Sequence, residues 1–164
     1  RQRRRNLVLR EVVEDVRKPM SYYMKKYGVT FRNEVPPNLR TPPVYASELY
    51  SILLNILSNA LKAIYNRPQR MIAVEAEKVK KTLYLRMKDT GVGVPVERRE
   101  ISFKPFESSS LPNPVLGVGT GLGLKVVRDI LDLYDGTARF IDVEKPWNTC
   151  IEIEIPERNA GNGN

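Results

Sequence analysis

The sequence predicts an α+β two-layer sandwich, in which helices pack on one face of a mixed, mostly antiparallel sheet. Helix-like and strand-like segments do not alternate in the regular βαβ order of a parallel sheet. Four strand-like segments occur as two consecutive pairs, which favours antiparallel neighbours. One helix-like segment, Glu48–Asn66, is apolar around most of its circumference, so we expect it to be buried. The length of 164 residues is enough for one domain with a substantial core.

The first part of the chain is predicted to contain two helices and one strand. Pro19 should interrupt or kink the first helix, and Gly28 should end it. Arg67-Pro68 should stop the second helix. The predicted elements are an amphipathic helix at 6–26, a strand at 29–35, a proline-rich connection at 40–45 with a short strand near Val44, and a long helix at 47–66.

The second part of the chain is predicted to contain two strand pairs, with loops and a helix between them. Residues 103–120 lack periodicity and are rich in Ser, Pro and Gly, which predicts a mobile loop. The elements are strands at 71–79 and 82–88, a glycine loop at 89–95, a short helix or turn at 97–102, a helix at 122–134, and strands at 137–143 and 149–155. We expect one domain over 1–156, whose helix at 1–26 follows an upstream region, and a polar tail over 157–164.

Composition excludes several classes of function. The net charge of +8 favours anionic partners. Basic residues beyond the opening run are dispersed without an aromatic–basic motif, so a nucleotide polyphosphate is a simpler partner than nucleic acid. The absence of His argues against zinc sites and Cys/His nucleophiles, and Cys150 is expected to be a small core residue. The sequence has no membrane-spanning apolar run and no secretory signal, which predicts a cytoplasmic domain whose parent protein can still be membrane-anchored.

A narrow polar stripe runs along the long apolar helix. On a helical wheel it spans roughly 60° and contains Glu48, Asn55, Asn59, Lys62 and Asn66. The stripe is either the solvent face of an unusually apolar helix or the lining of a pocket, because buried amides and a buried Lys need polar partners. Its two end residues are expected to be solvated.

Two glycine clusters follow this helix. Asp89-Thr-Gly91-Val-Gly93 comes directly after a strand; it is either a tight turn closed by the Asp89 side chain or a place where backbone approaches a ligand. Residues 117–124, Gly-Val-Gly-Thr-Gly-Leu-Gly-Leu, open a helix. Backbone N–H groups at a helix start bind anions, whereas the alternative is a flexible linker. The spacing matches neither a Walker loop nor a dinucleotide fingerprint.

Four motifs occur in a characteristic order: N-x-x-x-N-A-x-K, D-x-G-x-G, F-x-P-F and G-x-G-x-G-x-G. In this order they resemble the GHKL ATPases, which have the Bergerat fold, and most closely the catalytic ATP-binding domain of sensor histidine kinases. The resemblance extends from about Val12 to Pro156. It implies a domain that binds ATP with Mg²⁺ beneath a mobile lid.

The resemblance assigns roles to the polar stripe and to the first glycine cluster. Asn59 would supply its side-chain oxygen to Mg²⁺, which prefers oxygen ligands. Asn55 would line the phosphate region, and Lys62 would meet a phosphate as a point charge. Asp89 would accept a hydrogen bond from the adenine amino group. Gly91 and Gly93 would give the base room.

The resemblance also assigns roles to later residues. Phe103-Lys-Pro-Phe106 would be the hinge at the base of the lid, although it can equally be a pair of core aromatics. Lys104 is the nearest basic residue to the lid and would act near the γ-phosphate, unless it is a solvated surface Lys. Thr149 would lie near adenine, or it is an ordinary strand Thr. The residues expected to cradle the phosphates are Gly117, Gly119, Thr120, Gly121, Leu122 and Gly123.

Two departures from the family pattern bear on activity. Ala63 stands where family kinases often have an aromatic residue, and no Lys or Arg occurs between Glu107 and Thr120. Asn55 stands where the hydrolytic members have a general-base Glu; an amide cannot take that proton, which favours phosphotransfer.

With no His in the chain, the phosphoacceptor is expected on a separate dimerisation domain, which would pass the phosphoryl group on to a response regulator. The alternatives are a GHKL-type ATPase and a non-hydrolysing ATP-binding module.

Overall fold

The computed structural model describes residues 2–105 and 123–158. The strands are β1 (Thr30–Asn33), β2 (Met71–Val79), β3 (Thr82–Asp89), β4 (Thr137–Ile141) and β5 (Thr149–Ile155). The helices are α1 (Leu9–Arg17), α2 (Ser21–Lys26), α3 (Ala46–Ile64) and α4 (Gly123–Asp132), with short 3₁₀ turns η1 (Lys18–Met20), η2 (Val96–Arg98) and η3 (Ile101–Phe103).

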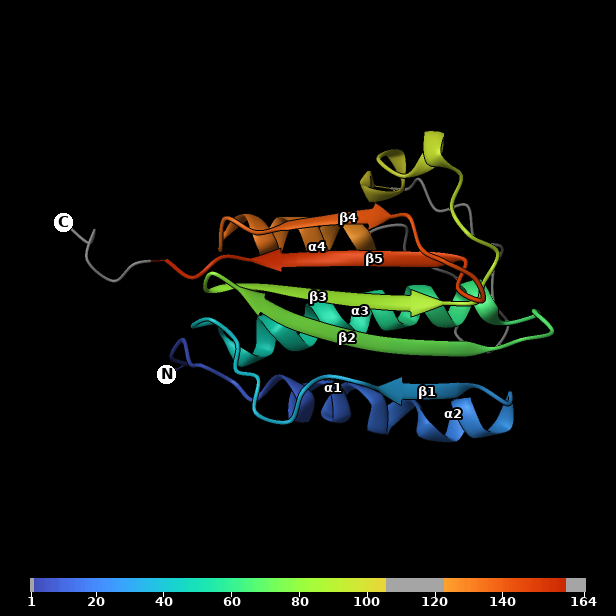
Figure 1. Cartoon of the computed structure of the whole chain (residues 1–164), viewed down its shortest axis with the longest axis horizontal. Coiled ribbons are helices and arrows are strands. Elements are labelled where there is room, and N and C mark those ends of the chain that lie inside the picture. The colour runs from blue at the N-terminus through green and yellow to red at the C-terminus, as the bar shows by residue number, and fades with distance from the viewer. Residues whose placement is uncertain (1, 106–122, 159–164) are drawn as a thin grey trace.

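Over the described residues, the sheet has five strands in the order β1-β2-β3-β5-β4. β1 runs parallel to β2, and the remaining neighbours are antiparallel, so the predicted mixed, mostly antiparallel sheet is confirmed. Figure 1 shows α3 and α4 behind the sheet and α1 and α2 along its β1 edge. None of the helices in this part of the chain is long and apolar enough to cross a membrane.

The long apolar helix forms the centre of the core. α3 buries eight residues, and none of them is polar. The residues of β3 are alternately half-buried and buried, and every second residue of β5 from Ile151 to Ile155 belongs to the same core. The core side chains of these elements include Ile52, Leu53, Ile56, Leu57, Leu61, Leu83, Leu85, Met87, Ile151, Ile153 and Ile155.

The N-terminal helix differs from its prediction. Residues 6–8, predicted to be helical, are extended: Arg5 and Val8 form antiparallel bridges to Val44 and Arg40. The short strand expected near Val44 is thus one of these bridges. The helix itself begins at Leu9 and is divided by η1, where Pro19 lacks the N–H that an unbroken α-helix requires. Interruption at Pro19 was therefore correctly predicted, whereas the start at residue 6 was wrong.

The edge strands are shorter than the sequence pattern suggests. β1 and β4 cover four and five residues instead of the predicted 29–35 and 137–143, whereas β2 and β5 begin and end where predicted. An edge strand has only one neighbour, so hydrogen bonding ends before the alternation of side chains does. The short helix or turn expected at 97–102 is the pair η2 and η3.

Cys150 is buried as expected, but not among the helices. It alternates with Thr149 and Ile151 on β5, which places it with Glu152 on the face opposite α3. Arg86 and Arg139 hold the Glu152 carboxylate on that face at 2.8 and 3.1 Å. Burial raises the pKa of the Cys150 thiol to about 11, so the thiol stays protonated and unreactive at neutral pH.

Candidate nucleotide-binding site

The polar stripe of α3 is neither fully buried nor fully solvated. Asn55, Asn59 and Lys62 are half-buried, and Asn66 is exposed beyond the end of the helix as predicted. Glu48 was wrongly expected at a solvated end. It is half-buried, and the Tyr134 hydroxyl donates a hydrogen bond to its Oε1 at 3.2 Å. The start of the stripe is thus tied to the turn that follows α4.

The Asn55 amide has a fixed orientation. Its Nδ2 donates one turn back to the Ser51 carbonyl oxygen at 2.7 Å. Its Oδ1 faces the first residue of α4: a Cβ atom built on Gly123 would lie 3.3 Å from it. The structure therefore brings together Asn55 of the polar stripe and Gly123 of the second glycine cluster, two residues that the resemblance assigns to the same phosphate region.

Asp89 lies at the end of β3 and is 3% exposed. The Gly91 N–H donates to its Oδ1 at 2.8 Å, so the turn closed by this side chain is present. Burial raises the pKa of the Asp89 carboxyl to about 7, against smaller lowering effects of the Gly91 N–H and the Thr149 hydroxyl. The two neighbouring donors do not offset the cost of burying the negative charge, so this carboxylate is suited to accept a further hydrogen bond from a ligand.

The glycines after Asp89 are needed for two different reasons. A Cβ on Gly91 would come within 2.7 Å of the Cβ and carbonyl oxygen of Ala63 and of Asp89 Oδ1. The Val92 N–H donates to the same Ala63 carbonyl at 3.2 Å, so the loop is fastened against the end of α3. A Cβ on Gly93 would be in ordinary van der Waals contact with the Asn148 carbonyl oxygen at 3.5 Å, but the residue has a φ of +80°. Gly91 thus permits close packing and Gly93 permits the backbone turn.

Thr149 lies directly opposite Asp89 in the β3–β5 register. Its side chain is buried, and its hydroxyl lies near enough to the Asp89 carboxyl to lower the pKa of that carboxyl, although it makes no hydrogen bond of normal geometry to any described residue. A buried hydroxyl is normally hydrogen-bonded, so one without a partner among the described residues is consistent with a place near a ligand, and the role of Thr149 stays a prediction. The two groups form one polar spot at the sheet end nearest Ala63.

Sequence reasoning missed Asn148 and Thr90, which hold this loop in place. The Asn148 backbone N–H donates to the Asp89 carbonyl oxygen at 2.9 Å, and its Nδ2 donates to the Gly91 and Thr90 carbonyl oxygens at 3.0 and 3.3 Å. The Thr90 hydroxyl donates to the Gln69 carbonyl oxygen at 2.7 Å. The only sequence signal for Asn148 is its place before the last strand.

The start of the predicted hinge is part of the core. Phe103 is buried, packs against Phe140 at a ring distance of 5.4 Å, and has the Arg128 guanidinium 3.6 Å above its ring. Lys104 is exposed, so its predicted role near a phosphate stays a prediction. The remaining predicted positions, Phe106, Gly117, Gly119, Thr120, Gly121 and Leu122, lie outside the described residues.

A family comparison agrees with this geometry. Residues 45–159 match the model of the histidine kinase-, DNA gyrase B- and HSP90-like ATPases, which is more than half of the chain and contains the polar stripe, the Asp89 loop and the start of α4.

The chain belongs to this family.

The similar proteins include sensor proteins and sensor histidine kinases. The C4-dicarboxylate transport sensor protein DctB of Rhizobium meliloti is 31% identical over 125 residues, which are 76% of this chain and 19% of DctB. The sensor histidine kinase GlrK of Escherichia coli is 31% identical over 108 residues, which are 66% of this chain and 22% of GlrK. The chain thus spans about a fifth of the length of these two relatives.

The likeness extends to three-dimensional structure. The catalytic domain of histidine kinase ThkA superposes with a TM-score of 0.79 at 23% identity, covering 94% of this chain and 95% of that domain. The mycobacterial sensor histidine kinase MprB gives a TM-score of 0.74 at 24% identity, covering 94% and 98%. The predicted GHKL domain of histidine kinase type and its α+β fold are confirmed, and the family implies that the domain binds ATP.

Proposed function

We propose that the domain binds Mg-ATP between the Asp89 loop and the start of α4 and delivers the γ-phosphoryl group to a His on a separate dimerisation domain. The observation that carries this proposal is that α3 joins both ends of the site: Ala63 accepts a hydrogen bond from Val92 of the Asp89 loop, and Asn55, about two turns earlier, faces Gly123. Family membership gives the ligand class. GlrK is named as a sensor histidine kinase and DctB as a sensor protein, and the proposal extends the kinase activity to this chain.

The adenine end of the site is proposed at Asp89. A purine amino group would donate to the buried carboxylate, and the Thr149 hydroxyl would find the partner that it lacks among the described residues. Gly91 is packed too closely against Ala63 to provide free volume itself. The base would therefore lie against the loop rather than inside it.

The phosphate end is proposed at the middle of the stripe. Asn59 would supply an oxygen to Mg²⁺, and Lys62 a positive charge to a phosphate. Residues 2–105 and 123–158 contain no cluster of three or more Asp, Glu, His or Cys side chains that could bind a metal ion in the absence of a nucleotide. The ion would thus arrive with the phosphates, which fits a single neutral amide as its protein ligand. When bound it neutralises charge on the transferred group.

Phosphotransfer is favoured over hydrolysis by Asn55. Its Nδ2 is engaged by Ser51, and an amide oxygen takes no proton from water at neutral pH. The residues of this chain would act by positioning the nucleotide and by stabilising charge. One solved structure shows histidine kinase ThkA in complex with response regulator TrrA. By extension, a response regulator would be the final acceptor of the phosphoryl group from this system. The domain would act in the cytoplasm, where ATP is available.

The decisive experiment combines the domain with a His-containing dimerisation segment of its own parent protein and γ-labelled ATP. The expected result is acid-labile, base-stable label on that segment, lost with Asn59→Ala and retained with Lys81→Ala in the remote β2–β3 turn. Absence of such label would overturn the kinase assignment. Steady-state phosphate release by the domain alone, abolished by Asn59→Ala, would establish an ATPase instead. ATP binding without either reaction would leave a nucleotide-binding module.

A further inference from the structure

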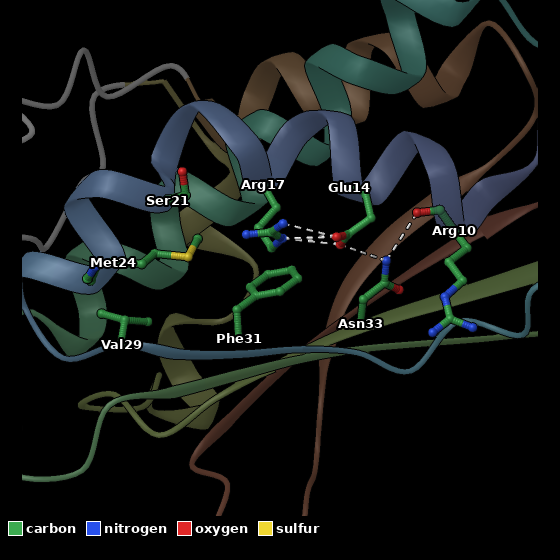
Figure 2. A pocket seen from close by; sticks show the side chains of 9 residues that line it. Arg10, Glu14, Arg17, Ser21, Met24, Val29, Phe31 and Asn33 are labelled. Carbon is green, nitrogen blue, oxygen red and sulfur yellow. Dashed lines mark hydrogen bonds and ion pairs between the residues drawn. The ribbon is translucent and has the colours of Figure 1, made fainter.

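A groove separates α1 and α2 from strand β1, at the open edge of the sheet; Phe31 and Asp89 lie at the same level of the sheet with β2 between their strands. The groove has a volume of about 590 Å³. Figure 2 shows the helices above and the strand below, with the Phe31 ring directed into the space between them. Residues 10, 14, 17 and 21 follow the spacing of a single helical face, next to the buried face formed by Leu9, Val13 and Val16. The groove is therefore a regular feature of these elements.

The groove follows an open sheet edge. β1 pairs with β2 on one side only. The Thr30 and Glu34 N–H groups donate to Arg70 and Val74 carbonyl oxygens, so even-numbered residues of this segment point their backbone groups toward β2. The backbone groups of Phe31 and Asn33 then point outward, and in the described part of the chain no residue bonds to them. Such a row of groups accepts an added strand.

The charge of the groove is positive. Arg10, Arg17 and Lys25 line it against a single carboxylate, Glu14. Arg17 holds Glu14 at 3.1 Å, and the Asn33 side chain donates to it at 3.1 Å, as Figure 2 shows. These contacts lower the pKa of Glu14, so its charge is present and already compensated at neutral pH.

Two cations of the groove remain available. Neither Arg10 nor Lys25 forms an ion pair with any residue in 2–105 or 123–158. Arg32, on the other face of β1, is exposed and adds a further positive charge at the same edge. A second copy of this chain, placed edge to edge, would bring like charges together. Charge complementarity therefore selects an acidic occupant.

We propose that this groove is a docking site for an extended acidic segment of a partner protein, which adds a strand to β1. Its backbone pairs with Phe31 and Asn33, alternate apolar side chains contact Met24, Val29 and Phe31, and its carboxylates meet Arg10 and Lys25. Affinity is modest, because β1 offers only two outward-facing residues. The groove shares no lining residue with the proposed nucleotide site, so failure of this proposal would leave the proposed kinase function intact.

The test uses the 164-residue chain and the peptide acetyl-Glu-Val-Glu-Val-Glu-Val-Glu-amide. We expect chemical-shift changes and slowed hydrogen exchange at the Phe31 and Asn33 amides, weakening as salt is raised. The double variant Arg10→Glu/Lys25→Glu should reduce affinity about tenfold or more. The matched charge change Lys80→Glu/Lys81→Glu, in the β2–β3 turn, should leave affinity unchanged.

Two further probes separate strand addition from general attraction. A peptide N-methylated at alternate residues keeps its charge but loses backbone donors, and it should not bind. Equal binding of that peptide, equal binding of a Lys-Val peptide, or shifts away from β1 would overturn the proposal. Concentration-dependent shifts at Phe31 without peptide would overturn it in favour of self-association.

Discussion

The side-chain oxygen of Asn55 lies 3.3 Å from the point where Gly123 would carry a Cβ atom. The two residues are far apart in sequence, in the middle of α3 and at the first position of α4. Their proximity joins the polar stripe to the second glycine cluster. It also means that Gly123 serves the site by leaving space beside an amide.

Gly123→Ala tests this relationship. A methyl group would press on Asn55 Oδ1, while Ala is a better helix former than Gly by about 1 kcal/mol. We expect ATP affinity to fall about tenfold, equivalent to about 1.4 kcal/mol, with thermal stability unchanged or raised. Calorimetric titration and a melting curve measure the two quantities. Lys125→Ala, in the same first turn, is the control; an equal effect of both variants would argue against the contact.

The stability of the nucleotide-free domain should depend on Asp89 and on pH. The folded-state pKa of about 7 lies above the ordinary value of 3.8, so between these values the folded protein holds a proton that the unfolded chain has lost. This contribution to the free energy of unfolding is complete below pH 3.8 and disappears as the pH rises through 7. Urea unfolding of wild type and Asp89→Asn at several pH values isolates it. If the difference in unfolding free energy between wild type and Asp89→Asn did not change with pH, Asp89 would not be the group with the raised pKa.

ATP affinity should show the opposite pH dependence. A carboxylate accepts the hydrogen bond from the adenine amino group, whereas a protonated carboxyl has to lose its proton first. Affinity should therefore rise from pH 6 to pH 8, around the pKa of about 7, with proton release at the lower pH. Calorimetry in buffers of different ionisation enthalpy measures that release. In Asp89→Asn both the pH dependence and most of the affinity should be lost; unchanged affinity would remove Asp89 from base recognition.

The two glycines of the Asp89 loop should tolerate Ala differently. At Gly91 the new Cβ meets Ala63 and Asp89 atoms at 2.7 Å, and we expect a loss of about 3 kcal/mol of stability. At Gly93 there is space, and the positive φ should cost about 1 kcal/mol. Denaturant midpoints of the two variants provide the comparison. A Gly93→Ala variant that is less stable than Gly91→Ala would refute the packing argument.

The sequence by itself determined the elements and the motifs. The alternation of β5, the apolar circumference of α3 and the interruption at Pro19 follow from side-chain spacing and backbone chemistry within a few residues. The order of the four motifs was enough to indicate the family, which the match over 45–159 confirmed.

Only the tertiary structure decided which of these residues meet. Pairing of β3 with β5 brings Thr149 opposite Asp89, and packing of α4 on α3 brings Tyr134 to Glu48, which the wheel had placed in solvent. The open groove beside β1 likewise depends on how α1 lies along the sheet edge. Periodicity records which way a side chain faces within its own element, whereas register and packing between distant elements depend on the whole core.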